Sequence, residues 1–327
     1  MVPPINYYET LQDAFLYYLR EVLNTGRKIS PRHRGTIELD GCCFRIRSPR
    51  ARLISIPSRR WSLPYALGEM LWHFSASREL DFISHYSKRW NQFSDDGKLI
   101  NGSCYGNRIF GKSNSELSRW EIARQLLMHD PDTRRCVITM YRPEDLAIAE
   151  VGSDLPCCNL LQFLVRDGQL CMIVYMRSND LMYGFTYDIF LFTMLQEMMA
   201  KELSLPLGWY QHVVGSLHIY NSDIEWAHEI ASYNGDQPAS MPPMQYLDQI
   251  SRVIEYEKMI RTSGSLIPEL TFDVKNYWRE ILLVLLYHRA KKTGDKFSIR
   301  AILERLKNTV YGNLISKDVP ESIGDGS

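Results

Sequence analysis

The sequence predicts an α+β protein in which a mostly antiparallel sheet packs on helices. Two observations carry this prediction. The first is a pair of apolar strands within residues 159–178, joined by Asp167-Gly168, which is a strong hairpin signal. The second is an almost continuously apolar helix over residues 187–204, a pattern typical of a helix buried at the centre of a fold.

The other elements of the core follow from periodicity and turn chemistry. Apolar residues at helical spacing predict an opening helix over residues 6–26. Alternating residues around Asp40-Gly41 predict a second hairpin over residues 35–48. Two more helices are expected over residues 63–77 and 113–130, and two more strands over residues 134–142 and 209–220.

From about residue 235 the pattern becomes helical. Helices are expected over residues 246–263, 273–292 and 298–312, followed by a polar, frayed end over residues 316–327. The simplest division is therefore an α+β core over residues 1–235 and a helical C-terminal extension over residues 236–327.

Composition narrows the function classes. The 327 residues are 45% apolar and carry 38 basic and 38 acidic side chains, which argues against nucleic-acid and membrane-surface binding and favours a small-molecule partner. Seven cysteines in a long chain without a secretory signal predict free thiols and a cytoplasmic protein. No spacing of cysteine and histidine suggests a metal site. The longest apolar run, residues 281–287, is too short to span a bilayer.

Cys157, which follows Pro156 at the entry to a strand, is a candidate nucleophile. A lone cysteine is more often a small buried hydrophobe, so the chemical interpretation requires a cationic neighbour that lowers the thiol pKa. Arg177 at the end of an apolar strand is one candidate, and with Ser178 it also suits a phosphate group.

Other polar residues stand in apolar patterns. Glu69 lies within an apolar helix, where burial raises the pKa of a carboxyl and makes it a proton shuttle. His218 and Tyr220, two residues apart on a strand, share one face. Arg134 and Arg135 are by default a solvated surface pair, and each of the others also suits a hydrogen-bonded core position.

Taken in their order along the chain, these sequence motifs resemble those of thymidylate synthase. The family pattern of Pro-Cys followed by Gln-Phe, then Arg-Ser-x-Asp, a glycine and a long helix, then Gly-x-x-His-x-Tyr, stands here as PCCNLLQF, MRSNDLMYGFTYDI and GSLHIY. Upstream, DPDTRR, RRWSLPYALGEMLWHF, RWNQF and CYGNR match further family segments. The resemblance is colinear over roughly residues 10–230 and fades beyond 235.

The resemblance implies a role for each matching residue. Cys157 matches the nucleophile that adds to carbon 6 of a pyrimidine nucleotide, and Glu69 matches the proton-relay glutamate. The nucleotide-binding positions are Arg32 (with Arg34 as a competing alignment), Arg177 and Ser178 for the phosphate, Arg134 and Arg135 for the phosphate of a neighbouring subunit in a homodimer, and His218 and Tyr220 for the sugar. Tyr105 and Trp90 match aromatic residues near the reacting centre, and the methylenetetrahydrofolate positions are Glu69, Trp90, Asp180 and Gly184.

One departure bears on the substrate. The family has Asn in its Pro-Phe-Asn segment, whereas this chain reads FTYDI, so that Asp188 takes the base-reading position. A carboxamide complements uracil, while a protonated carboxyl complements the ring nitrogen and amino group of cytosine. An ionised Asp188 facing uracil would leave a buried group unpaired, at a cost of roughly 1–3 kcal/mol. The alternative is that a water molecule lets Asp188 tolerate uracil.

This change resembles the cytidylate hydroxymethylases, relatives of thymidylate synthase that finish the reaction with water. Water as the last nucleophile gives a hydroxymethyl group, whereas hydride from the folate gives a methyl group. The short C-terminal tail that helps close the family's site is not recognisable here, which favours water. Cys158, Met176 and Ser216 replace polar family residues, so that both dCMP and CMP remain alternatives. The retained His218, Tyr220 and Ser178 slightly favour the deoxynucleotide.

The sequence therefore predicts a thymidylate-synthase-like homodimer that transfers a one-carbon unit from methylenetetrahydrofolate to carbon 5 of dCMP or CMP. One alternative is a thymidylate synthase acting on dUMP. The other is an inactive nucleotide-binding or scaffold protein, which the presence of Cys157, Glu69 and Arg177 argues against.

Overall fold

A computed structural model of the chain describes residues 5–112, 116–148, 150, 152–263 and 272–316. Within these ranges the centre of the fold is a mixed sheet with strand order β1-β3-β7-β6-β5-β4, and β2 pairs with β3 at the side. The strands are β1 (Asn6–Tyr8), β2 (Arg27–Ile29), β3 (Thr36–Ile46), β4 (Val137–Thr139), β5 (Cys158–Arg166), β6 (Gln169–Asp180) and β7 (Leu207–Tyr220). Only the β1–β3 and β6–β7 pairs are parallel, so the predicted mostly antiparallel sheet is confirmed.

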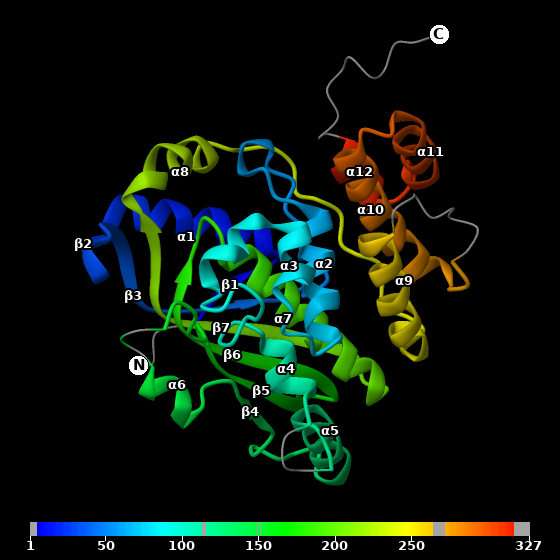
Figure 1. Cartoon of the computed structure of the whole chain (residues 1–327). Coiled ribbons are helices and arrows are strands. Elements are labelled where there is room, and N and C mark those ends of the chain that lie inside the picture. Colours follow the sequence, from blue (N-terminus) through cyan, green and yellow to red (C-terminus); the bar gives the residue numbers. More distant parts are fainter. Residues whose placement is uncertain (1–4, 113–115, 149, 151, 264–271, 317–327) are drawn as a thin grey trace.

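Three helices form a core with the sheet: the first and the last of them contact its strands, and the middle one packs on the last. They are α1 (Leu11–Thr25), α2 (Leu63–Phe74) and α7 (Phe185–Glu202), and they gather on one side of the sheet (Figure 1). Side-chain oxygens of Thr10 and Ser62 accept from backbone N–H groups at the starts of α1 and α2. As predicted, α7 is buried almost all round, because it lies between the sheet and the other helices.

Of the two predicted hairpins, the one at Asp167-Gly168 is confirmed and the one over residues 35–48 is wrong. Asp167 and Gly168, with φ of 51° and 69°, make the tight turn between β5 and β6. In contrast, residues 35–48 do not form a hairpin: β3 is continuous and pairs with β7 along its length. Gly41 does adopt a positive φ of 63°, but pairing with a distant strand, which local turn propensity does not report, keeps the chain extended.

The opening helix is shorter than predicted. Residues 6–8 form β1, which pairs in parallel with the end of β3, and the helix begins only at Leu11. The helix predicted over 113–130 begins at Arg119, after the cap Ser118, and residues 113–115 lie outside the described residues. The remaining core helices are α3 (Leu80–Tyr86), α4 (Tyr105–Phe110), α5 (Arg119–His129), α6 (Pro143–Ala147) and α8 (Ile224–Ala231).

The C-terminal helices gather beside α2 (Figure 1). They are α9 (Ile250–Thr262), α10 (Asn276–Thr293), α11 (Lys296–Leu306) and α12 (Val310–Ile315), so that the helix predicted over residues 298–312 is in fact two. Tyr86 Oη donates to Glu257 Oε1 at 2.8 Å, and Trp278 is fully buried in the same hydrophobic core as α2. Of the polar end predicted over residues 316–327, all but residue 316 lies outside the described residues.

Candidate active site

Cys157 lies at the entrance to β5, where Arg177 of β6 reaches it. The Nη2 of Arg177 is 3.7 Å from Cys157 Sγ, and the guanidinium also donates to the carbonyl oxygens of Leu155 and Pro156. Burial raises the pKa of the Cys157 thiol to about 11, and Arg177 lowers it only in part. Arg177 is thus a cationic neighbour that lowers this pKa, as expected from the sequence, but burial outweighs it in the free protein. The thiol is protonated at neutral pH, with one guanidinium in place to stabilise the thiolate as it forms.

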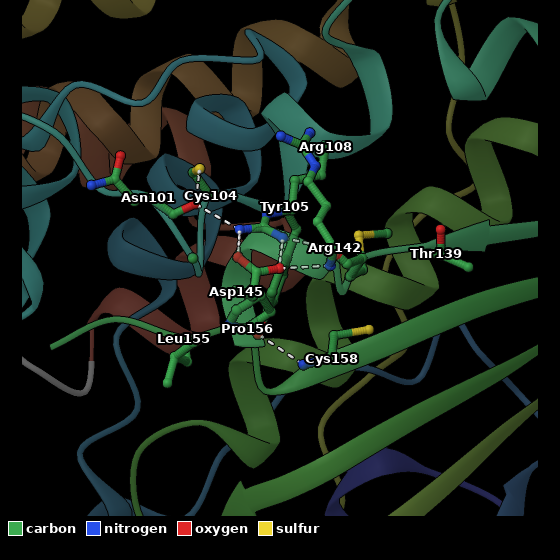
Figure 2. A network of polar contacts seen from close by, with 12 residues as sticks. Asn101, Cys104, Tyr105, Arg108, Thr139, Arg142, Asp145, Leu155, Pro156 and Cys158 are labelled. Carbon is green, nitrogen blue, oxygen red and sulfur yellow. Dashed lines mark hydrogen bonds and ion pairs between the residues drawn. The ribbon is translucent and has the colours of Figure 1, made fainter. Parts of the chain in front are cut away.

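Cys158, the neighbouring thiol, points into the core. Its side chain is fully buried, and burial raises its pKa well above the usual range. The backbone N–H of Cys158 donates to the hydroxyl oxygen of Tyr105 at 3.2 Å, which brings the start of α4 against the Cys157 loop (Figure 2). Because that oxygen accepts from the backbone, Tyr105 keeps its own proton to donate, as a residue beside the reacting centre requires.

Glu69 is buried on α2 and belongs to a short hydrogen-bond chain. Tyr65 Oη donates to Glu69 Oε1 at 2.7 Å and accepts from Trp90 Nε1 at 3.0 Å. Burial raises the pKa of Glu69 to about 8, and the nearby carboxylate of Asp188 acts in the same direction. A carboxyl in this state exchanges protons near neutral pH, as the sequence predicted for a proton shuttle.

Asp188 stands in the first turn of α7, next to Asn179 of β6. The side chain of Asn179 donates from Nδ2 to Asp188 Oδ2 at 2.8 Å. Burial raises the pKa of Asp188 to about 7, so that both protonation states are accessible. Gly184 leaves the space for this contact, because a Cβ there would lie 2.9 Å from Asp188 Oδ2 and 3.1 Å from Asn179 Nδ2.

The ends of β6 and β7 bring the predicted sugar and phosphate residues together. Ser178 Oγ lies 3.4 Å from His218 Nδ1, and the rings of His218 and Tyr220 are 5.2 Å apart. Asp180 is directly opposite His218 in the parallel register, and burial raises its pKa. Burial also raises the pKa of Tyr220, and the nearby side chains of Asp180 and Cys157 act in the same direction. These four residues therefore belong to the same cluster as the thiol.

The predicted arginines divide into two groups. Arg32 and Arg34 are exposed on the loop after β2, and both guanidinium groups lower the pKa of Tyr220, so either can serve the phosphate. Arg134 and Arg135 precede β4 at the edge of the sheet and are exposed. Neither has an ion-pair partner among the described residues, and the structure does not bring them to Cys157.

Asp154 and Arg108 hold the loops that carry Tyr105 and Cys157. The buried carboxylate of Asp154 accepts from the backbone N–H of Gly102 at 2.6 Å and from the hydroxyl of Ser103 at 2.6 Å. Arg108 donates to both oxygens of Asp145, at 2.5 and 2.7 Å, as Figure 2 shows. The bonds of Asp154 link the loop before Cys157 to residues 102–103, just before Tyr105, and Arg108 ties α4 to α6.

Sequence reasoning missed Tyr65 and Asn179. Tyr65 is one helical turn before Glu69, so the spacing of four residues was an available signal. Asn179 stands at the unassigned position of the Arg-Ser-x-Asp motif, and its contact with Asp188 joins residues nine apart on different elements. Nothing in the local pattern of the sequence predicts that contact.

Across the described ranges, no group of three or more histidine, cysteine, aspartate or glutamate side chains is arranged to hold a metal ion. In the same ranges, none of the helices has the length and apolar content needed to cross a bilayer.

Comparison with known proteins relates the chain to one family. A family model described as thymidylate synthase matches residues 13–261. The chain is 30% identical over 218 residues to the deoxyuridylate hydroxymethyltransferase of Bacillus phage SP01, covering 64% of this chain and 57% of that protein. It is 29% identical over 209 residues to the enzyme of the same name from Delftia phage PhiW-14, covering 61% and 57%.

A bacterial relative matches over a longer stretch. The chain is 24% identical over 256 residues to the thymidylate synthase of Francisella philomiragia, covering 74% of this chain and 91% of that protein. The alignments thus span little more than half the length of the phage proteins but nearly all of the bacterial one.

Proposed function

This chain belongs to the thymidylate synthase family, and we propose that it is a one-carbon transferase of pyrimidine nucleotides that makes a 5-hydroxymethyl cytidylate. The proposed acceptor is dCMP or CMP, the one-carbon donor is methylenetetrahydrofolate, and water completes the reaction. The observation that carries the proposal is Asp188 at the base-reading position, with its pKa raised to about 7.

The carboxyl of Asp188 supports cytosine through its hydrogen-bonding pattern. Oδ2 accepts from Asn179, so a proton on the carboxyl resides on Oδ1. Such a carboxyl donates from Oδ1 to the ring nitrogen of cytosine and accepts from the amino group, whereas uracil offers a ring N–H and a carbonyl oxygen. With uracil, one buried group on the protein stays unpaired, at a cost of roughly 1–3 kcal/mol, or about tenfold to a hundredfold in preference.

The chemistry of the proposed reaction begins at Cys157. Its sulfur adds to carbon 6 of the pyrimidine while Arg177 stabilises the thiolate, and carbon 5 becomes the nucleophile. Carbon 5 attacks the one-carbon unit of methylenetetrahydrofolate, and loss of the carbon 5 proton with departure of tetrahydrofolate leaves an exocyclic methylene. Water adds to that methylene as the bond between carbon 6 and the Cys157 sulfur breaks. Arg177, Ser178 and Arg32 or Arg34 suit the nucleotide phosphate, and His218 with Tyr220 suits the sugar.

Glu69 and Trp90 support the folate side of the site and the use of water. The half-buried indole of Trp90, held by the hydroxyl of Tyr65, offers a flat surface for a pteridine ring. Asp180 and Gly184 are the further residues on this side. Glu69, with a pKa of about 8, is able to accept a proton from water as it adds to the exocyclic carbon.

A homodimer is part of the proposal, because the sheet has a second face that the described helices leave open. One row across this face consists of Cys43, Val213, Tyr175 and Leu160, which are paired in register on β3, β7, β6 and β5. Tyr175 is 41% exposed. A second copy covering this row would also explain why the guanidinium groups of Arg134 and Arg135 have no ion-pair partner within the described part of one subunit.

A second candidate is 5-hydroxymethylation of deoxyuridylate. The observation that favours it is the printed name of the two phage relatives. A thymidylate synthase acting on dUMP is the remaining enzymatic alternative. An inactive binding protein is disfavoured, because a binding site has no use for a thiol, a guanidinium and a buried carboxyl in one cluster.

Product analysis separates these candidates. The full-length protein is incubated with methylenetetrahydrofolate and dCMP, CMP or dUMP, and the products are identified by mass spectrometry. A hydroxymethyl group on dCMP or CMP is the expected result. Product from dUMP alone, whether hydroxymethyl or methyl, contradicts the proposed substrate. The variant Asp188→Asn is expected to shift the ratio of kcat/KM values towards uracil by about tenfold or more.

A further inference from the structure

A buried chain of hydrogen bonds continues from Asp188 into the core. Asn179 Oδ1 is 3.0 Å from His212 Nε2, and His212 Nδ1 is 2.8 Å from the hydroxyl of Tyr210. Tyr210 and His212 are fully buried on β7, and Asn179 is 2% exposed on β6. The chain therefore links the core of the sheet to the carboxyl at the start of α7.

The chemistry of these side chains determines which atom donates in each of the hydrogen bonds. Burial lowers the pKa of His212 to about 3, so the ring is neutral and carries one N–H. The oxygen of Asn179 only accepts, so that N–H is on Nε2, and Nδ1 accepts from Tyr210. Asn179 is then left with its NH2 group facing Asp188.

We propose that His212, held by Tyr210, is a specificity-determining residue of this enzyme, because it fixes the orientation of the Asn179 amide against Asp188. The inference rests on the proposed function, since it explains how the carboxyl is oriented towards cytosine. His212 is a positioning residue: among its contacts are Asn179 and Tyr210, and it acts on the base only through Asn179.

With the Asn179 amide in the opposite orientation, Oδ1 of Asp188 would change from a donor to an acceptor towards the base. With the oxygen of Asn179 facing Asp188, the proton of the carboxyl would be drawn to Oδ2 to satisfy that oxygen. Oδ1 would then only accept, which suits the ring N–H of uracil and not the bare ring nitrogen of cytosine. An N–H on His212 Nε2 disfavours this orientation, because it would face the NH2 group of Asn179.

The test uses two variants and a packing control. His212→Phe removes both ring nitrogens and frees the amide to turn, so the ratio of kcat/KM for dCMP over dUMP should fall about tenfold. Tyr210→Phe removes one hydroxyl with little change in volume and should lower the ratio by about threefold. Phe44→Leu is the control, since the Phe44 ring packs 5.5 Å from the His212 ring and has no part in the chain. An unchanged ratio in folded Tyr210→Phe and His212→Phe proteins, or an equal fall in Phe44→Leu, overturns the inference.

A spectroscopic readout does not depend on the substrate. In 15N NMR of histidine-labelled protein, the His212 signal is identified among the eight histidines by its loss in His212→Phe. Hydrogen on Nε2 and a bare Nδ1 are expected, and Asn179→Ala should abolish that preference. Hydrogen on Nδ1 refutes the proposed direction of the chain. If dUMP is the only substrate while Nε2 carries the hydrogen, the proposed function fails and the positioning role of His212 stands.

Discussion

Cys157 and Cys158 are adjacent thiols with different surroundings. Cys157 is partly exposed beside Arg177, whereas Cys158 is fully buried and has no cationic group within hydrogen-bond distance in the described residues. Only a thiolate attacks carbon 6, and only the first thiol has a guanidinium in place to stabilise one. The contrast decides which of the two can act as nucleophile.

We predict that Cys157→Ala abolishes turnover and that Cys158→Ala does not. Cys158→Ala keeps the backbone N–H that donates to Tyr105 and loses one sulfur from the core, so a cost of about 1 kcal/mol in the free energy of unfolding is expected. Release of tritium from carbon 5 of the nucleotide measures the attack. Activity in Cys157→Ala, or its loss in folded Cys158→Ala, would reverse the assignment.

Asp188, the proposed base-reading residue, is also expected to affect the stability of the folded protein. Burial raises its pKa in the folded protein to about 7 from an ordinary value of 3.8. The unfolded chain therefore ionises first as the pH rises, and the stability of the folded protein falls between about pH 4 and pH 7. At higher pH the folded protein carries a buried charge at this position.

We predict that Asp188→Asn raises the melting temperature at pH 8, by about 4 °C or more, and leaves it nearly unchanged near pH 4. The amide oxygen at position 188 still accepts from Asn179, so the contact seen in the free protein is kept. Thermal unfolding at both pH values, with Asp95→Asn as an exposed control, measures the effect. An equal difference at the two pH values would show that the charge of Asp188 is not its cause.

The sequence suggests Cys157 and Asp188 as site residues, because each is part of a motif whose members keep a fixed local spacing. Asn179 and His212 could not be predicted in the same way. Their roles depend on contacts between β6, β7 and α7, and register across strands is not a local property of the chain. The raised pKa of Cys157 was missed for the same reason, because burial comes from the whole fold.

At the scale of elements, the site is assembled where loops meet the ends of β5, β6 and β7. The β5–β6 hairpin was predictable, because its turn residues adopt the positive φ angles that the strands require. The failed hairpin over residues 35–48 shows the limit of such signals. Gly41 has the same kind of φ, but β7 supplies a partner for all of β3, and long-range pairing decides the outcome.

We predict that Asp154→Ala slows catalysis by about tenfold or more without a matching change in KM, because the loop of Cys157 loses its link to residues 102–103. Unpaired buried N–H groups should also cost about 2–3 kcal/mol in the free energy of unfolding. Steady-state kinetics and denaturant unfolding measure the two effects. Asp95→Ala is the matched control, because Asp95 accepts from Ser153 on the same loop but is exposed. Equal losses in both variants would refute a specific role for Asp154.

At the scale of the whole molecule, the C-terminal helices share one hydrophobic core with α2, the helix that carries Glu69. Tyr86 of α3 donates to Glu257 of α9, and burial raises the pKa of that carboxyl although Arg261 opposes the change. The sequence predicted these helices but not their contact with the helix of the proton shuttle. The sequence pattern predicted the apolar faces of these helices, but it did not predict that α2 packs against them.

The proposed homodimer predicts that two inactive variants restore each other. Cys157→Ala lacks the nucleophile, and the double variant Arg134→Ala with Arg135→Ala lacks the arginines expected to reach the partner's phosphate site. When both are unfolded together and refolded as a 1:1 mixture, half of the dimers contain one of each, and one of their two sites is intact. Activity should therefore return to about a quarter of the wild-type value. Cys157→Ala mixed with itself is the control and stays inactive. A mixture that gains no activity, with heterodimers present by native mass spectrometry, would show that the arginines act within their own subunit or have no part in the site.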